Sequence, residues 1–201
     1  MGRTSDARER LISEAGRLFH TRSYEAVGVQ ELCEAAGVNK GSFYHFFPSK
    51  DDLAAAVIDA HWDAVQDGIL LPALADDIAP LARIERFFDK LSRVQRASRK
   101  DLGVTLGCPL ANLSGELCNH EPKLRRKLAR VFDGMRDALA ETLRDAVAAG
   151  ELPRKSDVSR SAEALVAFAE GAMLLSAAHD DAALVGRLGR LALGLVGAPG
   201  R

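Results

Sequence analysis

The sequence predicts an all-α fold, in which a small N-terminal helical domain precedes a larger helical one. Apolar residues recur at steps of three and four through most of the 201 residues, the spacing of one face of an α-helix. No run of four or more residues alternates in the β-branched, turn-bounded way of a half-buried strand. The chain is 47% hydrophobic and 27% charged, as in soluble globular proteins. We therefore expect a folded protein of about nine helices.

The first fifty residues predict three helices joined by short connectors. We expect the first helix to begin at the capping cluster of residues 4–6 and to end near Arg22. The second covers residues 29–36 and the third residues 40–46, with a tight turn at residues 37–39 between them. Helices that meet at such a turn form a helix-turn-helix, so residues 1–50 are predicted to be one small domain.

Residues 51–201 predict a second, larger helical domain. Ser49 can cap its first helix, and Leu71–Pro72 is expected to bend or end that helix because proline lacks the backbone N–H. Proline in first turns, glycine at ends and the apolar spacing predict further helices at residues 80–98, 109–118, 122–149, 158–178 and 182–196.

The segment that follows Gly37 has the composition of a helix that enters the major groove of DNA. Gly37 permits the tight turn before this helix, and Asn39 is placed to cap it. Phe43 and Phe47 share the inner face at a spacing of four residues. The outer face is predicted to present to the groove Lys40, Gly41, Ser42, Tyr44 and His45.

Lys50 and Tyr44 are the predicted contacts to the DNA backbone. Lys50 lies near the N-terminus of the next helix, where an ammonium and backbone N–H groups can bind one phosphate together. The net charge of −1 argues against binding by bulk charge, so the contact with DNA must be local. An aromatic-rich core helix with no ligand is the alternative interpretation.

These residues resemble the N-terminal signature of the TetR family of transcriptional repressors. The match spans roughly residues 8–53 and includes residues 31–38, residues 40–44, Phe47 and Lys50. The resemblance implies an all-helical homodimer that binds a palindromic operator in double-stranded DNA. It also implies a regulator without enzyme activity or cofactor, which releases the operator when a small molecule enters the C-terminal domain.

The sequence departs from that signature at two positions. Gly28 stands where relatives usually carry Thr or Ser, whose hydroxyl caps the second helix and often touches a phosphate, so we expect this contact to be lost. Phe46 replaces a common His or Tyr. These departures leave open a helical adaptor that does not bind DNA.

Cys108 is the candidate sensing residue. It precedes Pro109, which suits the first turn of a helix, so the thiol is expected at the positive end of the peptide dipoles, where the reactive thiolate is favoured. Residues 107–118 are also similar to the N-ethylmaleimide-type, electrophile-responsive branch of the same family. A buried structural cysteine is the other interpretation.

The remaining polar and aromatic residues of the larger domain give weaker indications. No metal site is expected at Cys108, Cys118 and His120, because paired ligand spacings are missing. A thiol-dependent detoxifying protein is an alternative, although no base is evident near Cys108 in the sequence. A ligand pocket could be lined by residues that would otherwise be plain core: Trp62, Phe87, Phe88, Phe132, Met135, Phe168 and Met173.

The sequence favours a cytoplasmic protein over an exported or membrane protein. Its first residues lack the apolar core of a signal peptide, and the apolar stretch 182–196 is interrupted by Arg187 and Arg190. By the resemblance, residues 158–178 and 182–196 would form a homodimer interface. The expected partners are therefore operator DNA, a small-molecule inducer or electrophile, and a second copy of the chain.

Overall fold

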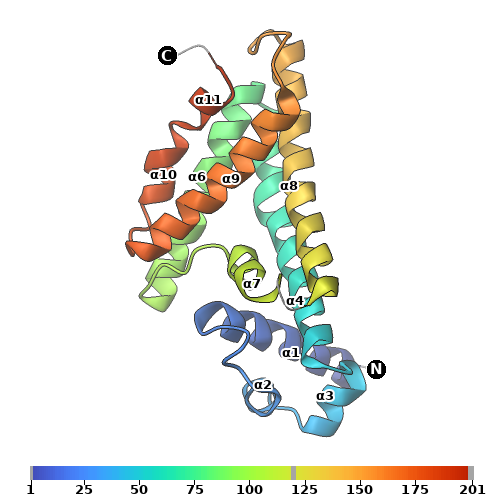
Figure 1. Cartoon of the computed structure of the whole chain (residues 1–201). Helices are drawn as coiled ribbons and strands as arrows, with labels where there is room; N and C mark the ends of the chain where they lie inside the picture. The colour runs from blue at the N-terminus through green and yellow to red at the C-terminus, as the bar shows by residue number, and fades with distance from the viewer. Residues whose placement is uncertain (1, 119–120, 199–201) are drawn as a thin grey trace. The chain divides into compact units, whose positions relative to one another are not determined.

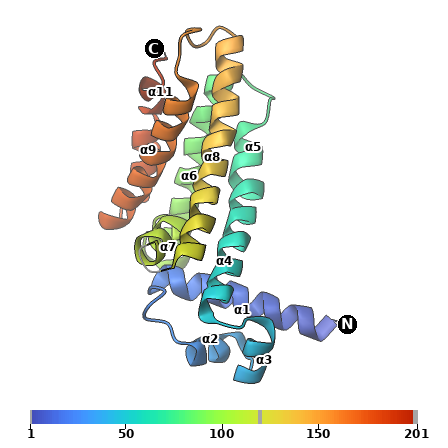
Figure 2. The ribbon, with the colours of Figure 1, turned by 45° about the vertical axis from the view of Figure 1, so that its right-hand side comes forward.

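Helices and their connectors make up the whole of the described chain, in agreement with the predicted all-α class (Figures 1 and 2). The computed structural model describes residues 2–118 and 121–198, with the side chains of residues 2–5 left out, and no strand occurs in these ranges. The chain divides into two compact units, residues 1–63 with 109–129 and residues 64–108 with 130–201. The predicted DNA-binding segment lies within the first unit.

The first unit contains the three N-terminal helices, α1 (Gly2–Thr21), α2 (Val29–Ala36) and α3 (Lys40–Phe46). The bounds predicted for α2 and α3 are confirmed. The predicted start of α1 at residues 4–6 is wrong, because the helix already begins at Gly2. The core of this unit is closed by fully buried side chains from successive helices: Leu11, Leu32, Phe43 and Leu53.

The next helix changes its hydrogen-bond pattern before it reaches the proline. α4 (Lys50–Val65) continues into a π-helical turn, η1 (Gln66–Leu70), and then into the short α5 (Leu71–Leu74). Pro72 has no N–H to donate to the preceding turn, and a wider π turn directly before it accommodates that loss. The helix therefore ends two residues beyond Pro72, close to the predicted break.

α6 (Pro80–Leu102) and α9 (Val158–Ala178) are long helices of the second unit, and both begin where predicted. α8 (Pro122–Ala148) also begins at its expected proline, and α7 (Pro109–Leu117) belongs to the first unit, where it packs on α1. Figures 1 and 2 both show α9 and the C-terminal segment beside α6, and these elements pack directly on one another.

The last helix predicted, over residues 182–196, is wrong as a single element. The chain forms α10 (Leu184–Gly189) and α11 (Ala192–Leu195) instead. Gly189 ends α10 where the backbone lies against Phe88, since an added Cβ would be only 2.6 Å from the Cβ of Phe88. Glycine is a poor helix former, so the helix is weak at this position although the apolar spacing continues through it.

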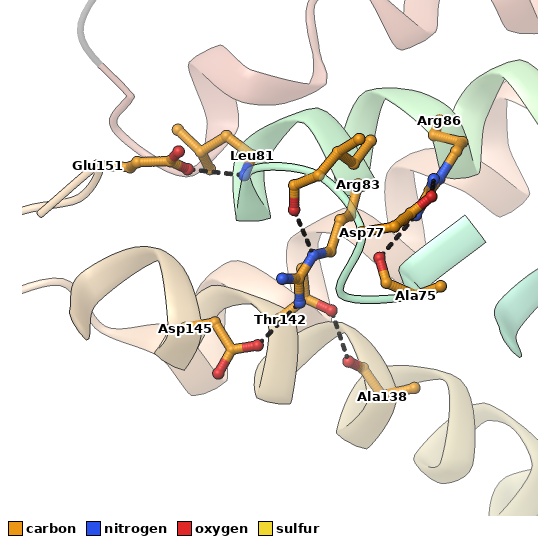
Figure 3. A network of polar contacts seen from close by, with 10 residues as sticks. Ala75, Asp77, Leu81, Arg83, Arg86, Ala138, Thr142, Asp145 and Glu151 are labelled. Atoms are coloured by element: carbon orange, nitrogen blue, oxygen red, sulfur yellow. Dashed lines mark hydrogen bonds and ion pairs between the residues drawn. The ribbon is translucent and has the colours of Figure 1, made fainter. Parts of the chain in front are cut away.

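A polar network joins the start of α6 to the end of α8 (Figure 3). Arg83 is buried and donates from Nε to the carbonyl oxygen of Ile78 at 2.8 Å and from a terminal nitrogen to Asp145 at 3.0 Å. The carboxylate of Glu151 accepts the backbone N–H of Leu81 at 2.8 Å. The N-cap residue of α6, Ala79, has no side chain that could cap the helix. Glu151, 70 positions further along the chain, accepts one of its first N–H groups instead.

Candidate nucleic-acid interface and cysteine site

The turn between α2 and α3 has the geometry predicted from its residues. Gly37 adopts the left-handed conformation, with φ 64° and ψ 40°. The N–H of Val38 donates to the carbonyl oxygen of Cys33 at 2.9 Å and so closes the end of α2. At the start of α3, the side-chain oxygen of Asn39 accepts the N–H of Ser42 at 2.8 Å. Both helix ends are thereby fixed by local hydrogen bonds.

α3 separates an inner aromatic face from an outer polar one, as predicted. Phe43 and Phe47 are buried, with their ring centroids 6.1 Å apart. Tyr44 is 54% exposed, although its ring packs edge-to-face on Phe43 at 5.1 Å. The structure brings the five predicted groove residues together on this one short helix, where Lys40, Gly41 and His45 are exposed and Ser42 is half-buried.

Lys50 has partners inside the first unit that the sequence did not reveal. Its ammonium donates to the carbonyl oxygens of Tyr24 at 3.0 Å and Val27 at 3.1 Å, and it lies 4.0 Å from the centre of the Tyr24 ring. Two of the three ammonium N–H groups are thus used to hold the connector between α1 and α2. The phosphate contact of Lys50 stays a prediction, and it would draw on the third N–H.

Side chains of α1 fix the positions of the two helices of the motif. Arg10 donates from Nε to the carbonyl oxygen of Ala36 at 3.0 Å, at the C-terminal end of α2. The guanidinium of Arg8 lies 5.4 Å from the centre of the Phe47 ring. These contacts hold α2 and α3 in one orientation, which a helix needs if it is to read a groove.

Gly28 occupies the N-cap position of α2 without a capping side chain. Its backbone is extended, with φ −87° and ψ 158°, as at an ordinary N-cap. A Cβ added there would meet no atom within 4 Å. There is therefore room at this position for the side chain of a serine or threonine. With glycine there instead, residue 28 offers no side-chain acceptor to the first N–H groups of α2.

The predicted ligand-pocket residues lie in different parts of the chain. Phe88 packs edge-to-face on Phe87 at 5.3 Å and on Phe168 at 5.7 Å, where Phe87 and Phe88 are buried and Phe168 is half-buried. Met135 and Met173 are buried, and Phe132 is half-buried. Trp62 belongs to the first unit, whereas the other six residues belong to the second. Their role in ligand binding stays a prediction.

Cys108 lies directly before α7, as predicted, and is 8% exposed. Its thiol hydrogen-bonds to the carboxyl group of Glu170 on α9. Burial, opposed by this hydrogen bond, raises the pKa of Glu170 to about 7. The sequence shows no such group near Cys108, because the carboxyl partner lies 62 positions away and only the fold brings the two together.

The other cysteines and the rejected metal site add little to this picture. Cys33 is buried, Cys118 is half-buried, and neither forms a disulfide. His120 lies outside the described residues. Among the described residues no group of three or more His, Cys, Asp and Glu side chains is placed to hold a metal ion.

Comparisons with known proteins cover both parts of the chain. The family model for bacterial regulatory proteins of the tetR family matches residues 11–57, and the model for the tetracyclin repressor-like C-terminal domain matches residues 80–191. The transcriptional regulator AcuR of Cereibacter sphaeroides is 35% identical over 169 residues, which are 84% of this chain and 75% of AcuR. The transcriptional repressor NemR of Escherichia coli is 27% identical over 69% of this chain and 67% of NemR.

Solved structures show the same fold. The regulatory protein TetR from Rhodobacter sphaeroides superimposes with a TM-score of 0.80 at 32% identity, over 92% of this chain and 96% of that one. The reduced form of Escherichia coli NemR superimposes with a TM-score of 0.82 over 96% of this chain and all of that one, at 22% identity.

Proposed function

Because the chain belongs to the TetR family of bacterial transcriptional regulators, we propose that it represses transcription as a homodimer on a palindromic operator. The proposed release signal is a small molecule or modification of Cys108. The observation that supports DNA binding most strongly is the outer face of α3, where Lys40, Tyr44 and His45 are exposed together beside a fixed turn. Residues 1–50 form the proposed DNA-binding domain. The relatives are regulators, and the chain is not an enzyme.

Exposed leucines support the proposed dimer. Leu174 on α9 is 65% exposed, and Leu191 between α10 and α11 is 64% exposed. Leu175 and Leu195 are also exposed. By length and composition α9 could cross a membrane, and its most apolar window is only one-third buried within the chain. A second copy, related by two-fold symmetry, would cover such apolar surface in a soluble regulator of the cytoplasm.

Operator binding is tested with DNA from upstream of the protein's own gene. We expect Lys40→Ala to weaken binding and to lower the slope of log affinity against log salt, because it removes one of the cations that would approach the DNA. Tyr44→Phe removes only the exposed hydroxyl and should cost about 1 kcal/mol, roughly a fivefold loss. Fluorescence anisotropy across a salt series measures both effects.

A matched control separates these local effects from a general change of charge. Lys155 is exposed in the connector after α8, so Lys155→Ala makes the same charge change away from α3 and should leave the affinity unaltered. Equal losses in Lys155→Ala and Lys40→Ala would contradict the assignment of α3. Lys50→Ala is a poor substitute, since it also frees the connector between α1 and α2.

The sensing role of Cys108 is tested by DNA release. Addition of methyl vinyl ketone, a small uncharged enone, should release the wild-type protein from its operator and leave an adduct on Cys108 in mass spectra. Cys108→Ser should stay bound, whereas Cys118→Ser should respond as the wild type does. Full release of Cys108→Ser by the enone would rule out sensing at this thiol.

A further inference from the structure

Cys108 is buried and lies against the half-buried Glu170, so a nucleophile and a carboxyl group are in contact. One oxygen of Glu170 takes part in the hydrogen bond with the thiol, and Oε2 is buried with no hydrogen-bond partner. Because burial raises the pKa of this carboxyl group to about 7, both its neutral and its ionised forms are populated near neutral pH. A carboxylate in contact with a thiol is positioned to accept the thiol proton.

Gln95 of α6 supplies a second, independent observation at the same place. It is only 2% exposed, and its Nε2 donates to the carbonyl oxygen of Gly107, next to Cys108, at 3.2 Å. The Oε1 on the same amide is buried without a hydrogen-bond partner. A buried oxygen in this state costs about 1–3 kcal/mol, which a polar group that donates to it would recover.

The backbone holds these groups against α9. Gly107 has φ 76°, which glycine adopts readily, and a Cβ added there would lie 3.3 Å from the carbonyl oxygen of Met173. The Gly107–Cys108 peptide thus lies between the amide of Gln95, which donates to it, and the backbone of α9. These contacts place the thiol of Cys108 beside Glu170.

Charged residues of the neighbouring helices do not shift the pKa of Glu170. On α6, Arg93 and Arg96 line a surface hollow together with Arg187 and Arg190 from the α10 segment. Arg99 of α6 forms an ion pair with Asp180 beyond the end of α9, next to His179, and Glu163 of α9 is exposed two turns before Glu170. None of these groups is among the causes that shift the pKa of Glu170, which are burial and the thiol of Cys108.

We propose that Glu170 is the general base that activates Cys108 for addition to small, uncharged α,β-unsaturated carbonyl compounds, an inference that rests on the proposed sensing role of Cys108. The carboxylate takes the thiol proton as the sulfur forms a bond to the β-carbon and the carbon–carbon π bond opens. Glu170 then returns the proton to the α-carbon of the enolate. Atoms and electrons balance in this addition without an oxidant or a metal.

The test is the rate at which methyl vinyl ketone forms the Cys108 adduct between pH 5.5 and 8, followed by mass spectrometry of the intact chain. The wild-type rate should rise with pH through a midpoint near the pKa of Glu170, about 7, and then level off. Glu170→Gln should react at least about tenfold more slowly at pH 7.5 and should lose the midpoint. Glu163→Gln, an exposed change on the same helix, should behave as the wild type.

The possible failures are distinguishable. An unchanged rate and midpoint in Glu170→Gln, with Cys108 still modified and DNA still released, would overturn the base assignment and leave the sensing role intact. If the wild-type chain forms no adduct on Cys108, both the sensing role and the inference are wrong. Circular dichroism of Glu170→Gln keeps the comparison to folded protein, and this variant is expected to fold because it removes a buried ionisable group.

Discussion

At the scale of single residues, two polar side chains have roles that depend on distant partners. Lys50 is held by the carbonyl oxygens of Tyr24 and Val27, and Glu170 is held by the thiol of Cys108. The Tyr24 side chain is itself buried and hydrogen-bonded to Asp51, and both effects raise the pKa of its phenol, so the ring stays neutral beside the ammonium. Sequence position alone reveals none of these pairs.

The raised pKa of Glu170 predicts how stability depends on pH. Its ordinary pKa is 4.5 and its pKa in the folded chain is about 7, so between these values the folded state holds a proton that the unfolded state has lost. The free energy of unfolding therefore falls as the pH rises through this range, by up to about 3 kcal/mol. Glutamine does not titrate, so Glu170→Gln should not lose stability in this way. The free energy of unfolding of Glu170→Gln minus that of the wild type should therefore be larger at pH 8 than at pH 5.

Urea unfolding at pH 5 and pH 8 measures this difference. The exposed Glu163→Gln serves as the control and should change stability little at either pH. A stability difference between Glu170→Gln and the wild type that is the same at both pH values would show that Glu170 titrates normally in the folded chain.

At the scale of helices, the sequence predicts the helix ends that local capping residues determine, but not the features that depend on contacts between distant residues. α2 and α3 have their predicted bounds because Gly37 and Asn39 close their ends with local hydrogen bonds. The break between α10 and α11 was not predicted, and it follows Gly189, a poor helix former whose backbone packs on Phe88, about a hundred residues away in the chain. The outer polar face of α3 could be predicted from helical spacing, whereas the Cys108–Glu170 pair depends on the packing of α9.

The bare N-cap of α2 predicts a variant that strengthens the DNA-binding unit. Gly28→Ser adds an oxygen that can accept an N–H of the first turn of α2, at a site where a Cβ meets no neighbour. We expect stability to rise by a few tenths of a kcal/mol. The same hydroxyl can donate to a phosphate, so operator affinity should rise by about 1 kcal/mol, roughly fivefold.

Gly28→Ala separates the hydroxyl from the Cβ. Alanine cannot cap the helix, so this variant should be less stable than Gly28→Ser and should gain no affinity for the operator. The denaturation midpoint in urea and the anisotropy of labelled operator report the two effects. Equal operator affinity in both variants would mean that residue 28 does not approach the DNA.

At the scale of the whole molecule, the chain combines a compact unit that carries the proposed DNA-binding helix with a unit that carries the proposed dimer surface and the Cys108–Glu170 pair. Family membership and the exposed leucines of α9 and its neighbours both support a two-fold assembly. A dimer of this kind would place two copies of α3 on successive major grooves, about 34–36 Å apart or a multiple of that distance. The operator must then be an inverted repeat, since its symmetry reflects that of the protein.

In vitro selection from random double-stranded DNA, carried out in parallel with the wild type and Lys40→Ala, tests this account most directly. The wild type is predicted to enrich one inverted repeat, bound by an even number of chains in sedimentation, with half-sites at the spacing of one or more helical turns. Lys40→Ala should enrich that repeat weakly or not at all. Enrichment of no sequence by the wild type, or of a single half-site bound by one chain, would contradict the proposed homodimeric repressor.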